Sequence, residues 1–247
     1  MAPVPMLLHL ARLACLTVAA ALALHGPPAA GAQGQGASYG FLWEASRGAE
    51  RVLLLGAMHV GRPAAAATYR ADRPGLREAQ VIAFEANVFD AQASLAATQR
   101  WALYPQGAPG LEAHVDAALL ARIEKLLAQA DSGLPACCRM KPWMLANTLV
   151  VLESLRAGLN PAYGSEAQLY QLALATGRPV VEIEGVDEQL RLFDEAPLSV
   201  QLDYLRHTVE TIEDGSGRAE IEQLVGAWER GDAAALQRQL EQMTASD

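Results

Sequence analysis

Apolar and polar positions follow two different periods along the chain, and each period predicts a different kind of element. Short apolar runs predict strands at residues 81–84 and 179–185. Two further runs, at 39–44 and 51–55, flank a polar stretch and predict a hairpin. The run at 51–55 is apolar almost throughout, so we expect its strand to be covered on both faces.

Longer segments repeat their apolar residues every three to four positions and predict helices. They cover residues 111–130, 142–158, 165–177 and 198–212, with two shorter segments around 220–228 and 232–243. Pro142 suits a first helical turn and Gly158 a stop, while Ser165 and Gln168 have the spacing of a capping box. Because strands alternate with helices and neither a repeat nor a linker divides them, residues 33–247 are predicted to form one helix-rich α/β domain with a central mixed sheet.

The N-terminal segment has a different pattern and predicts a secretory signal. An apolar run at residues 13–24 follows Arg12 and precedes a stretch of small residues, in which Ala30-Gly31-Ala32 fits a cleavage site. The run is shorter than the roughly twenty residues that a membrane span requires. We therefore expect residues 1–32 to be removed, leaving a periplasmic or secreted protein without a stable membrane span; an uncleaved N-terminal anchor is the alternative.

Charge and composition narrow the classes of partner. The 247 residues include 19 basic and 28 acidic side chains, which gives a formal net charge of −9. Binding to nucleic acid requires clustered Lys and Arg side chains that neutralise phosphates, and the sequence has no such cluster. An apolar content of 51% also disfavours intrinsic disorder, so we expect a folded protein with a hydrophobic core.

Each of three predicted strands ends near an ionisable residue, and these residues are His59, Glu85 and Glu184. Sites in open α/β sheets form at the carboxyl ends of the strands. One imidazole and two carboxylates suit a divalent ion such as zinc, manganese or iron, and three protein ligands leave a position for water, which the ion acidifies into a nucleophile.

Structural roles are the alternative for these residues. Gly56 and Gly61 bracket His59, so the backbone can turn tightly or approach a ligand closely there. The same pattern fits a strand-to-loop turn with a hydrogen-bonded histidine. Glu184 fits an exposed strand face equally well, with Val181 and Ile183 on the opposite, core-facing side.

Several motifs resemble those of the TraB/GumN family (TraB/PrgY/GumN), whose relatives include the Tiki metalloproteases. The most specific are Gly56-x-x-His59 and the strand-end Glu85. Other segments in the family's order are Phe41 to Glu44, Lys141-Pro142-Trp143, Gly158 to Gly164, Arg178 to Glu184, Ala227-Trp228 and Gly231-Asp232. The resemblance covers nearly all of the chain after the predicted signal.

This resemblance implies a fold like those of EreA, ChaN and TraB, and the activity of an exported, peptidase-like metallohydrolase with a peptide or small molecule as its substrate. The cofactor would be a divalent ion, Mn, Co or Zn. Carried over by position, His59 would bind the ion, Glu85 would bind it or act as general base, and Glu184 would be a third ligand or orient one. His59 and Glu85 are thus the expected catalytic residues.

The sequence departs from the family pattern near its C-terminus. The family carries a second G-x-x-H on a late strand, and no second motif of this form occurs before Asp247. We therefore expect the C-terminal strands to be missing, as in a truncated protein, or to be supplied by another chain. A non-catalytic envelope protein that binds peptide or haem, as ChaN-type proteins do, and an inactive family member are the alternatives to an enzyme.

Overall fold

The computed structural model describes residues 40–63, 75–76, 78–129 and 139–245. The predicted signal at residues 1–32 lies outside the described residues. The described chain divides into two compact units. Unit 1 contains residues 83–158 and 182–220, and unit 2 contains the remaining described residues, at 40–82, 159–181 and 221–245.

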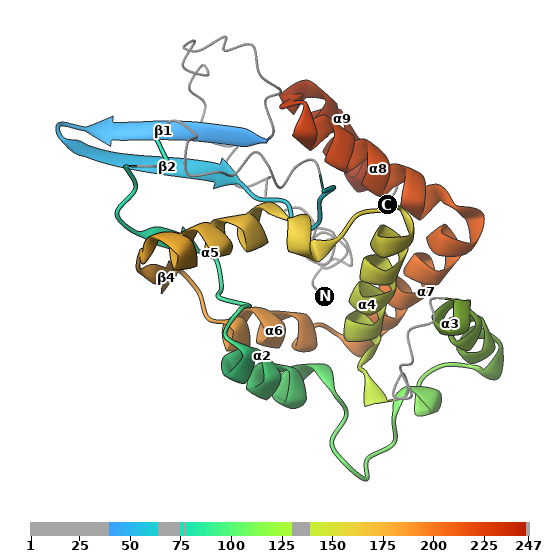
Figure 1. The fold of residues 1–247 in the computed structure, drawn as a ribbon. Coiled ribbons are helices and arrows are strands. Elements are labelled where there is room, and N and C mark those ends of the chain that lie inside the picture. The colour runs from blue at the N-terminus through green and yellow to red at the C-terminus, as the bar shows by residue number, and fades with distance from the viewer. Residues whose placement is uncertain (1–39, 64–74, 77, 130–138, 246–247) are drawn as a thin grey trace. The chain divides into compact units, whose positions relative to one another are not determined.

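A hairpin opens the described chain, and helices dominate the rest of it (Figure 1). The strands are β1 Phe41–Arg47, β2 Glu50–Gly56, β3 Ile82–Phe84 and β4 Val180–Glu182. The helices are α2 Ala91–Ala97, α3 Ala117–Gln129, α4 Pro142–Arg156, α5 Ser165–Thr176, α6 Val186–Asp194, α7 Leu198–Asp214, α8 Ser216–Glu229 and α9 Ala233–Ala245, with short helical turns η3 Thr98–Ala102, η4 Leu111–Ala113 and η6 Pro161–Tyr163. The helix-rich α/β class is confirmed. None of the described helices is long and apolar enough to cross a membrane.

The core of unit 1 lies where α3, α4 and α7 pack together, with α4 and α7 side by side (Figure 1). The apolar side chains of these helices recur every three to four residues, so each helix buries one stripe. The buried residues include Leu119 and Ile123 of α3, Leu145 and Leu149 of α4, and Leu205 and Val209 of α7. This packing positions the elements that follow β3 and β4.

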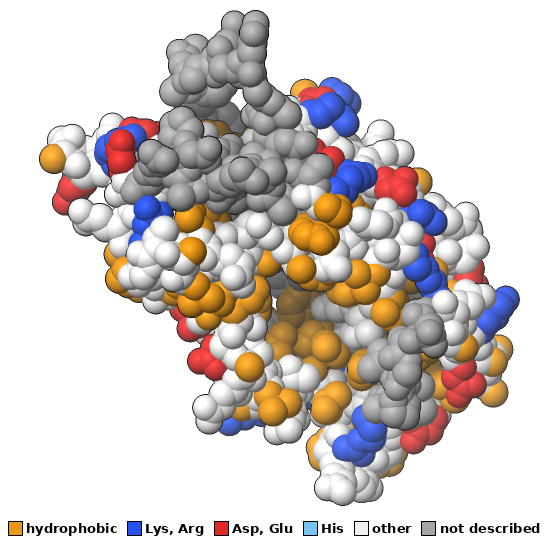
Figure 2. Space-filling model, viewed as in Figure 1, with side chains coloured by type: hydrophobic (Ala, Val, Ile, Leu, Met, Phe, Trp, Pro, Cys, Tyr) orange, Lys and Arg blue, Asp and Glu red, His pale blue; other side chains and the backbone are white. Residues whose placement is uncertain are grey.

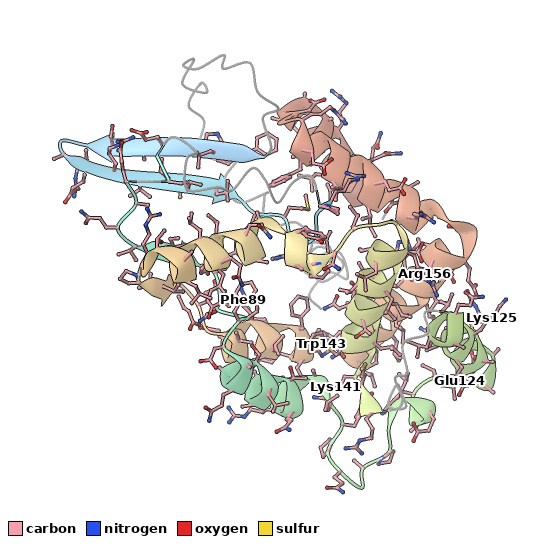
Figure 3. All side chains as sticks on the ribbon, viewed as in Figure 1. Phe89, Glu124, Lys125, Lys141, Trp143 and Arg156 are labelled. Carbon is pink, nitrogen blue, oxygen red and sulfur yellow. The ribbon has the colours of Figure 1, made fainter. Side chains whose placement is uncertain are left out.

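The start of α4 is attached to the end of α6. The Lys141 ammonium lies 2.5 Å from Asp194 Oδ1, and the Trp143 ring stacks on Phe193 with centroids 5.1 Å apart. Figure 3 shows Lys141 and Trp143 at one end of α4 and Arg156 at the other. Pro142 begins the helix, as predicted, because its missing N–H would have no intrahelical partner in the first turn.

One predicted helix begins later than expected. The apolar spacing predicted a helix from residue 111, but α3 begins at Ala117. Asp116 explains the boundary, since its Oδ1 accepts a hydrogen bond from the Leu119 backbone N–H at 2.7 Å and so caps the new helix. Leu111 belongs to the separate turn η4 and is still buried in the same core.

The hairpin of unit 2 is longer than the sequence predicted. β1 and β2 pair antiparallel from Phe41 opposite Gly56 to Arg47 opposite Glu50, so most of the polar stretch between the predicted strands is itself strand. The expectation that β2 is covered on both faces is wrong, because Val52 is 57% exposed and Leu54 is 43% exposed.

Trp228 of α8 is hydrogen-bonded to the residue before β1 and to the last residue of β2. Its buried indole N–H donates to the Gly56 carbonyl at 2.9 Å, and its own carbonyl accepts from the Gly40 N–H at 3.0 Å. Gly40 has φ +75°, and a Cβ there would lie 2.6 Å from the indole ring. The last residue of β2, which leads into the loop of His59, is therefore fixed to a buried side chain.

The short strands β3 and β4 form a second sheet of two strands. In unit 2 the Ile82 N–H donates to the Pro179 carbonyl, and in unit 1 the Ile183 N–H donates to the Phe84 carbonyl. Because the numbers of the bonded residues rise together, the strands run parallel and their carboxyl ends lie at the same edge. Among the described residues, the strands thus form two separate pairs where the sequence predicted one central mixed sheet.

A polar hollow of about 480 Å³ lies beside α3, α4 and α7 in unit 1. Arg156 donates to Glu153 Oε2 and to the Leu126 carbonyl, so its charge is paired within the hollow. Glu213 accepts from the Arg122 guanidinium at 2.6 Å, which lowers the pKa of Glu213 below its ordinary value. The lining residues are Lys125, Leu126, Gln129, Glu153, Arg156, Ile212 and Glu213.

The core packing of unit 1 predicts the effect of a truncation in α7. Leu205 is fully buried, so Leu205→Ala should lower the free energy of unfolding by about 2–5 kcal/mol through lost apolar contact and a residual cavity. Leu198, the first residue of the same helix, is 41% exposed and serves as the control, with an expected loss below about 1 kcal/mol. Urea unfolding of both variants checks this, and equal losses would contradict the packing.

The pair formed by Arg122 and Glu213 predicts a dependence of stability on pH. The folded-state pKa of Glu213 is lowered by the hydrogen bond from Arg122, so the pair stabilises the folded protein above the ordinary glutamate pKa, about 4.3, and this contribution is lost as the pH falls through the folded-state pKa. Arg122→Gln should therefore lower the melting temperature at pH 7, and this deficit should shrink as the pH falls through the folded-state pKa of Glu213, whereas the exposed Arg238→Gln should have no effect at any pH in this range. A deficit of Arg122→Gln that does not change down to the lowest pH at which the protein folds would argue against this assignment.

Candidate functional site

His59 lies in a loop that follows β2 in unit 2. β2 ends at Gly56, whose carbonyl is held by Trp228, and the loop runs through the buried Met58 to Gly61. The His59 side chain is 39% exposed, so it is accessible to solvent while its backbone lies against protein. The local sequence thus places a titratable ring on a loop whose start is fixed.

The loop of His59 is held along its length by the segment that precedes α5. Gly61 and Asn160 exchange two backbone hydrogen bonds, at 3.1 and 2.9 Å. The Met58 N–H donates to Ser165 Oγ at 2.7 Å, and the Met58 carbonyl accepts from the Ser165 N–H at 2.8 Å. We call these two segments, residues 56–61 and 160–165, the clasp. With a further bond from the Ser165 hydroxyl to the Met58 carbonyl at 3.3 Å, five hydrogen bonds enclose His59 between Met58 and Gly61.

Two glycines allow the clasp to close. A Cβ at Gly61 would overlap the Tyr163 carbonyl oxygen, and a Cβ at Gly164 would lie 2.5 Å from the His59 carbonyl oxygen. Both contacts are to backbone atoms, which cannot move aside as the end of a side chain can. The sequence predicted that the glycines beside His59 let the backbone turn tightly or approach a ligand closely. At Gly61 the group that approaches is the backbone of the chain itself, and the approach to a ligand stays a prediction.

Glu166 is the side chain that the clasp brings to His59. Its Oε2 bonds His59 Nδ1, and its side chain is only 16% exposed. The sequence did not point to Glu166, because the spacing of Ser165 and Gln168 predicted a capping box. That prediction is wrong: Ser165 Oγ bonds the Met58 backbone, and Gln168 Nε2 donates to the Ala162 carbonyl. The available signal was an acidic residue two positions after the Gly158 to Gly164 segment of the family pattern.

Glu85 and Glu184 stand side by side at the ends of β3 and β4 in unit 1. The Glu184 N–H donates to the Glu85 carbonyl at 2.7 Å, so the backbone brings the two residues together as the strand-end argument predicted. Glu85 is partly buried and Glu184 is exposed. The expected core-facing side of β4 is wrong, because Val181 is 45% and Ile183 is 73% exposed. In Figure 2 apolar side chains lie at the surface where Figure 1 places α5 and β4.

The structure does not join all three predicted site residues through one sheet. His59 follows β2, which pairs with β1, whereas Glu85 and Glu184 follow the pair of β3 and β4. His59 also belongs to unit 2 and the two glutamates to unit 1, so the set of three stays a prediction. Within the described ranges, no group of three or more His, Cys, Asp or Glu side chains is placed to hold a metal ion.

Comparison with known families identifies the chain. Residues 41–247 match the TraB/PrgY/gumN family. The chain belongs to this family. The match begins at β1 and includes the clasp, Glu166 and both strand-end glutamates, so the resemblance drawn from the G-x-x-H motif is confirmed. None of the curated proteins and none of the solved structures matches the chain.

The clasp of this TraB/PrgY/gumN chain predicts a strong effect of a single methyl group. Gly61→Ala should destabilise the protein by about 1–3 kcal/mol, because the new Cβ meets the Tyr163 carbonyl oxygen and the clasp must open. Gly185→Ala is the matched control, since a Cβ there meets nothing within 4 Å. Thermal unfolding and limited proteolysis near residue 60 measure both effects, and a Gly61→Ala protein as stable as the control would rule out the close approach.

Proposed function

We propose that this family member is an exported, divalent-metal-dependent hydrolase that acts on a peptide or another small amide or ester. The observation that carries the proposal is the clasp, which uses five hydrogen bonds and two glycines to hold one half-exposed histidine beside a carboxylate. A loop that only links two elements tolerates changes in sequence and conformation. Such a loop would not require the hydrogen bonds and glycines of the clasp.

The donor atoms fit a divalent ion. Imidazole nitrogen and carboxylate oxygen are ligands of zinc, manganese and cobalt, and three protein ligands leave room for a substrate. His59 would hold the ion through its imidazole, and Glu85 and Glu184 through their carboxylates. When bound, the ion would polarise a substrate carbonyl and lower the pKa of water.

The residues of the chain have separate roles in this proposal. Glu85, which is partly buried, would bind the ion or accept a proton from the attacking water as general base. Glu184, which is exposed, would bind the ion or orient a ligand. His59 is supported by family membership and by the clasp, and Glu85 by its strand-end place beside Glu184.

Metal binding is the first test of the proposal. The purified chain should bind Mn²⁺, Co²⁺ or Zn²⁺ stoichiometrically, and His59→Ala should lose most of this affinity, as measured by calorimetry and elemental analysis. Glu124, an exposed residue of α3 labelled in Figure 3, provides the control Glu124→Gln, which should bind as the wild type does. Absence of binding at saturating metal would contradict the proposal, and a Soret band on mixing with haemin would favour the haem-binding alternative.

Hydrolysis of a quenched-fluorescent peptide library then separates an enzyme from a metal-binding protein. Glu85→Gln should lower kcat/KM at least about 100-fold, the usual range for loss of a general base, and Glu124→Gln should leave it unchanged. Hydrolysis that persists in Glu85→Gln would contradict the role of Glu85 as general base, and absence of hydrolysis from the metal-loaded wild type would contradict the enzymatic role.

A further inference from the structure

We infer that Glu166 is a positioning residue, which holds the His59 imidazole with its proton on Nδ1 and so makes Nε2 the nitrogen that faces a ligand. The first part of this inference stands on the contact between the two side chains. The second part, that the ligand is a divalent ion, rests on the proposed function.

The hydrogen bond between the two side chains fixes the position of one proton. Glu166 Oε2 bonds His59 Nδ1, and an ionised carboxylate can only accept hydrogen bonds. The proton of this bond therefore belongs to Nδ1. In a neutral imidazole the other nitrogen, Nε2, then carries the lone pair that a metal ion requires.

The backbone imposes this pairing on the two side chains. Met58 and Ser165, the residues directly before His59 and Glu166, are joined by three hydrogen bonds, at 2.7, 2.8 and 3.3 Å. The clasp therefore already holds the backbones of His59 and Glu166 next to each other. Little conformational entropy is left to lose when their side chains pair. Surface pairs of this chain differ: the side chains of Arg47 and Glu50 are 89% and 72% exposed, and such pairs are weak.

Burial and helix position also favour a lasting contact at Glu166. Its side chain is 16% exposed, so water competes poorly for the carboxylate, and a hydrogen bond in such surroundings is stronger than one at the surface. Glu166 also lies in the first turn of the twelve-residue helix α5, where a negative side chain interacts favourably with the helix dipole. By contrast, the His59 side chain is 39% exposed, which leaves the ring accessible to a ligand.

A carboxylate behind a metal-binding histidine has a known physical effect. It sets the tautomer, fixes the plane of the ring and raises the basicity of the coordinating nitrogen, and its removal typically costs about 10- to 100-fold in metal affinity. Glu166 would supply this effect without touching the ion or the substrate. Glu166 would therefore change the affinity of His59 for the ion, while the atoms that coordinate the ion would stay the same.

The first arm of the test needs no metal and no substrate. Long-range ¹H–¹⁵N correlation spectra of the ¹⁵N-labelled, metal-free chain, recorded at a pH of about 9 where imidazole is neutral, report the tautomer of each histidine. The His59 signals are those lost in His59→Ala. We expect the Nδ1–H form in the wild type and in Glu166→Gln, whose amide oxygen still accepts a hydrogen bond, and a mixture in Glu166→Ala. An Nε2–H form in the wild type would overturn the inference without any variant.

The second arm measures Zn²⁺, Mn²⁺ and Co²⁺ affinity by calorimetry. Glu166→Ala should bind about 10- to 100-fold more weakly than the wild type, with Glu166→Gln in between and Glu124→Ala unchanged. If the wild type shows the Nδ1–H form but binds no metal, the positioning role stands and the proposed function fails. If the wild type binds metal and Glu166→Ala matches it in both affinity and tautomer, the positioning role is overturned and the proposed function stands.

Discussion

The candidate site depends on the contact between two stretches of backbone that have no side chain in the way. Gly61 and Gly164 allow the loop of His59 to lie against the residues at the start of α5 and just before it, and the five hydrogen bonds of the clasp follow from that approach. A net hydrogen bond contributes about 0.5–1.5 kcal/mol, but a buried donor or acceptor left without a partner costs about 1–3 kcal/mol. A side chain at either glycine would thus remove several interactions together, because all of them require the same separation of the two chains.

Periodicity and local turn chemistry were sufficient to predict most of the elements. The hairpin and the start of α4 at Pro142 follow from residues that are near one another in sequence, and short-range rules are sufficient for them. The adjacency of Glu85 and Glu184 follows from the strand-end rule once β3 and β4 pair, but that pairing joins segments far apart in the chain. The close approach at Gly61 is likewise to a distant residue, Tyr163, which the glycine itself does not specify.

The partner of His59 could not be predicted in this way, because it lies 107 residues further along the chain. Ser165 illustrates the reason. Its position before a helix favours a local cap, but its hydroxyl bonds the Met58 backbone, a tertiary contact with no local signature. The burial of β2 and β4 was predicted wrongly for a related reason. Leu54 and Ile183 are apolar and still exposed, because an apolar run reports strand preference and does not report which faces other elements cover.

The three proposed ligands differ in what binding would cost them. His59 is already bonded through Nδ1 to Glu166 and flanked by the clasp, so its ring has little rotamer freedom left to lose. Glu184 is exposed, and fixing a glutamate side chain costs up to about 1.5–2 kcal/mol of conformational entropy. An arrangement that orders one ligand in advance gains affinity mainly by removing this cost. Because the clasp and Glu166 order His59 in advance, His59 would contribute most to the initial affinity for the ion. Glu184 would contribute least until other groups have bound the ion.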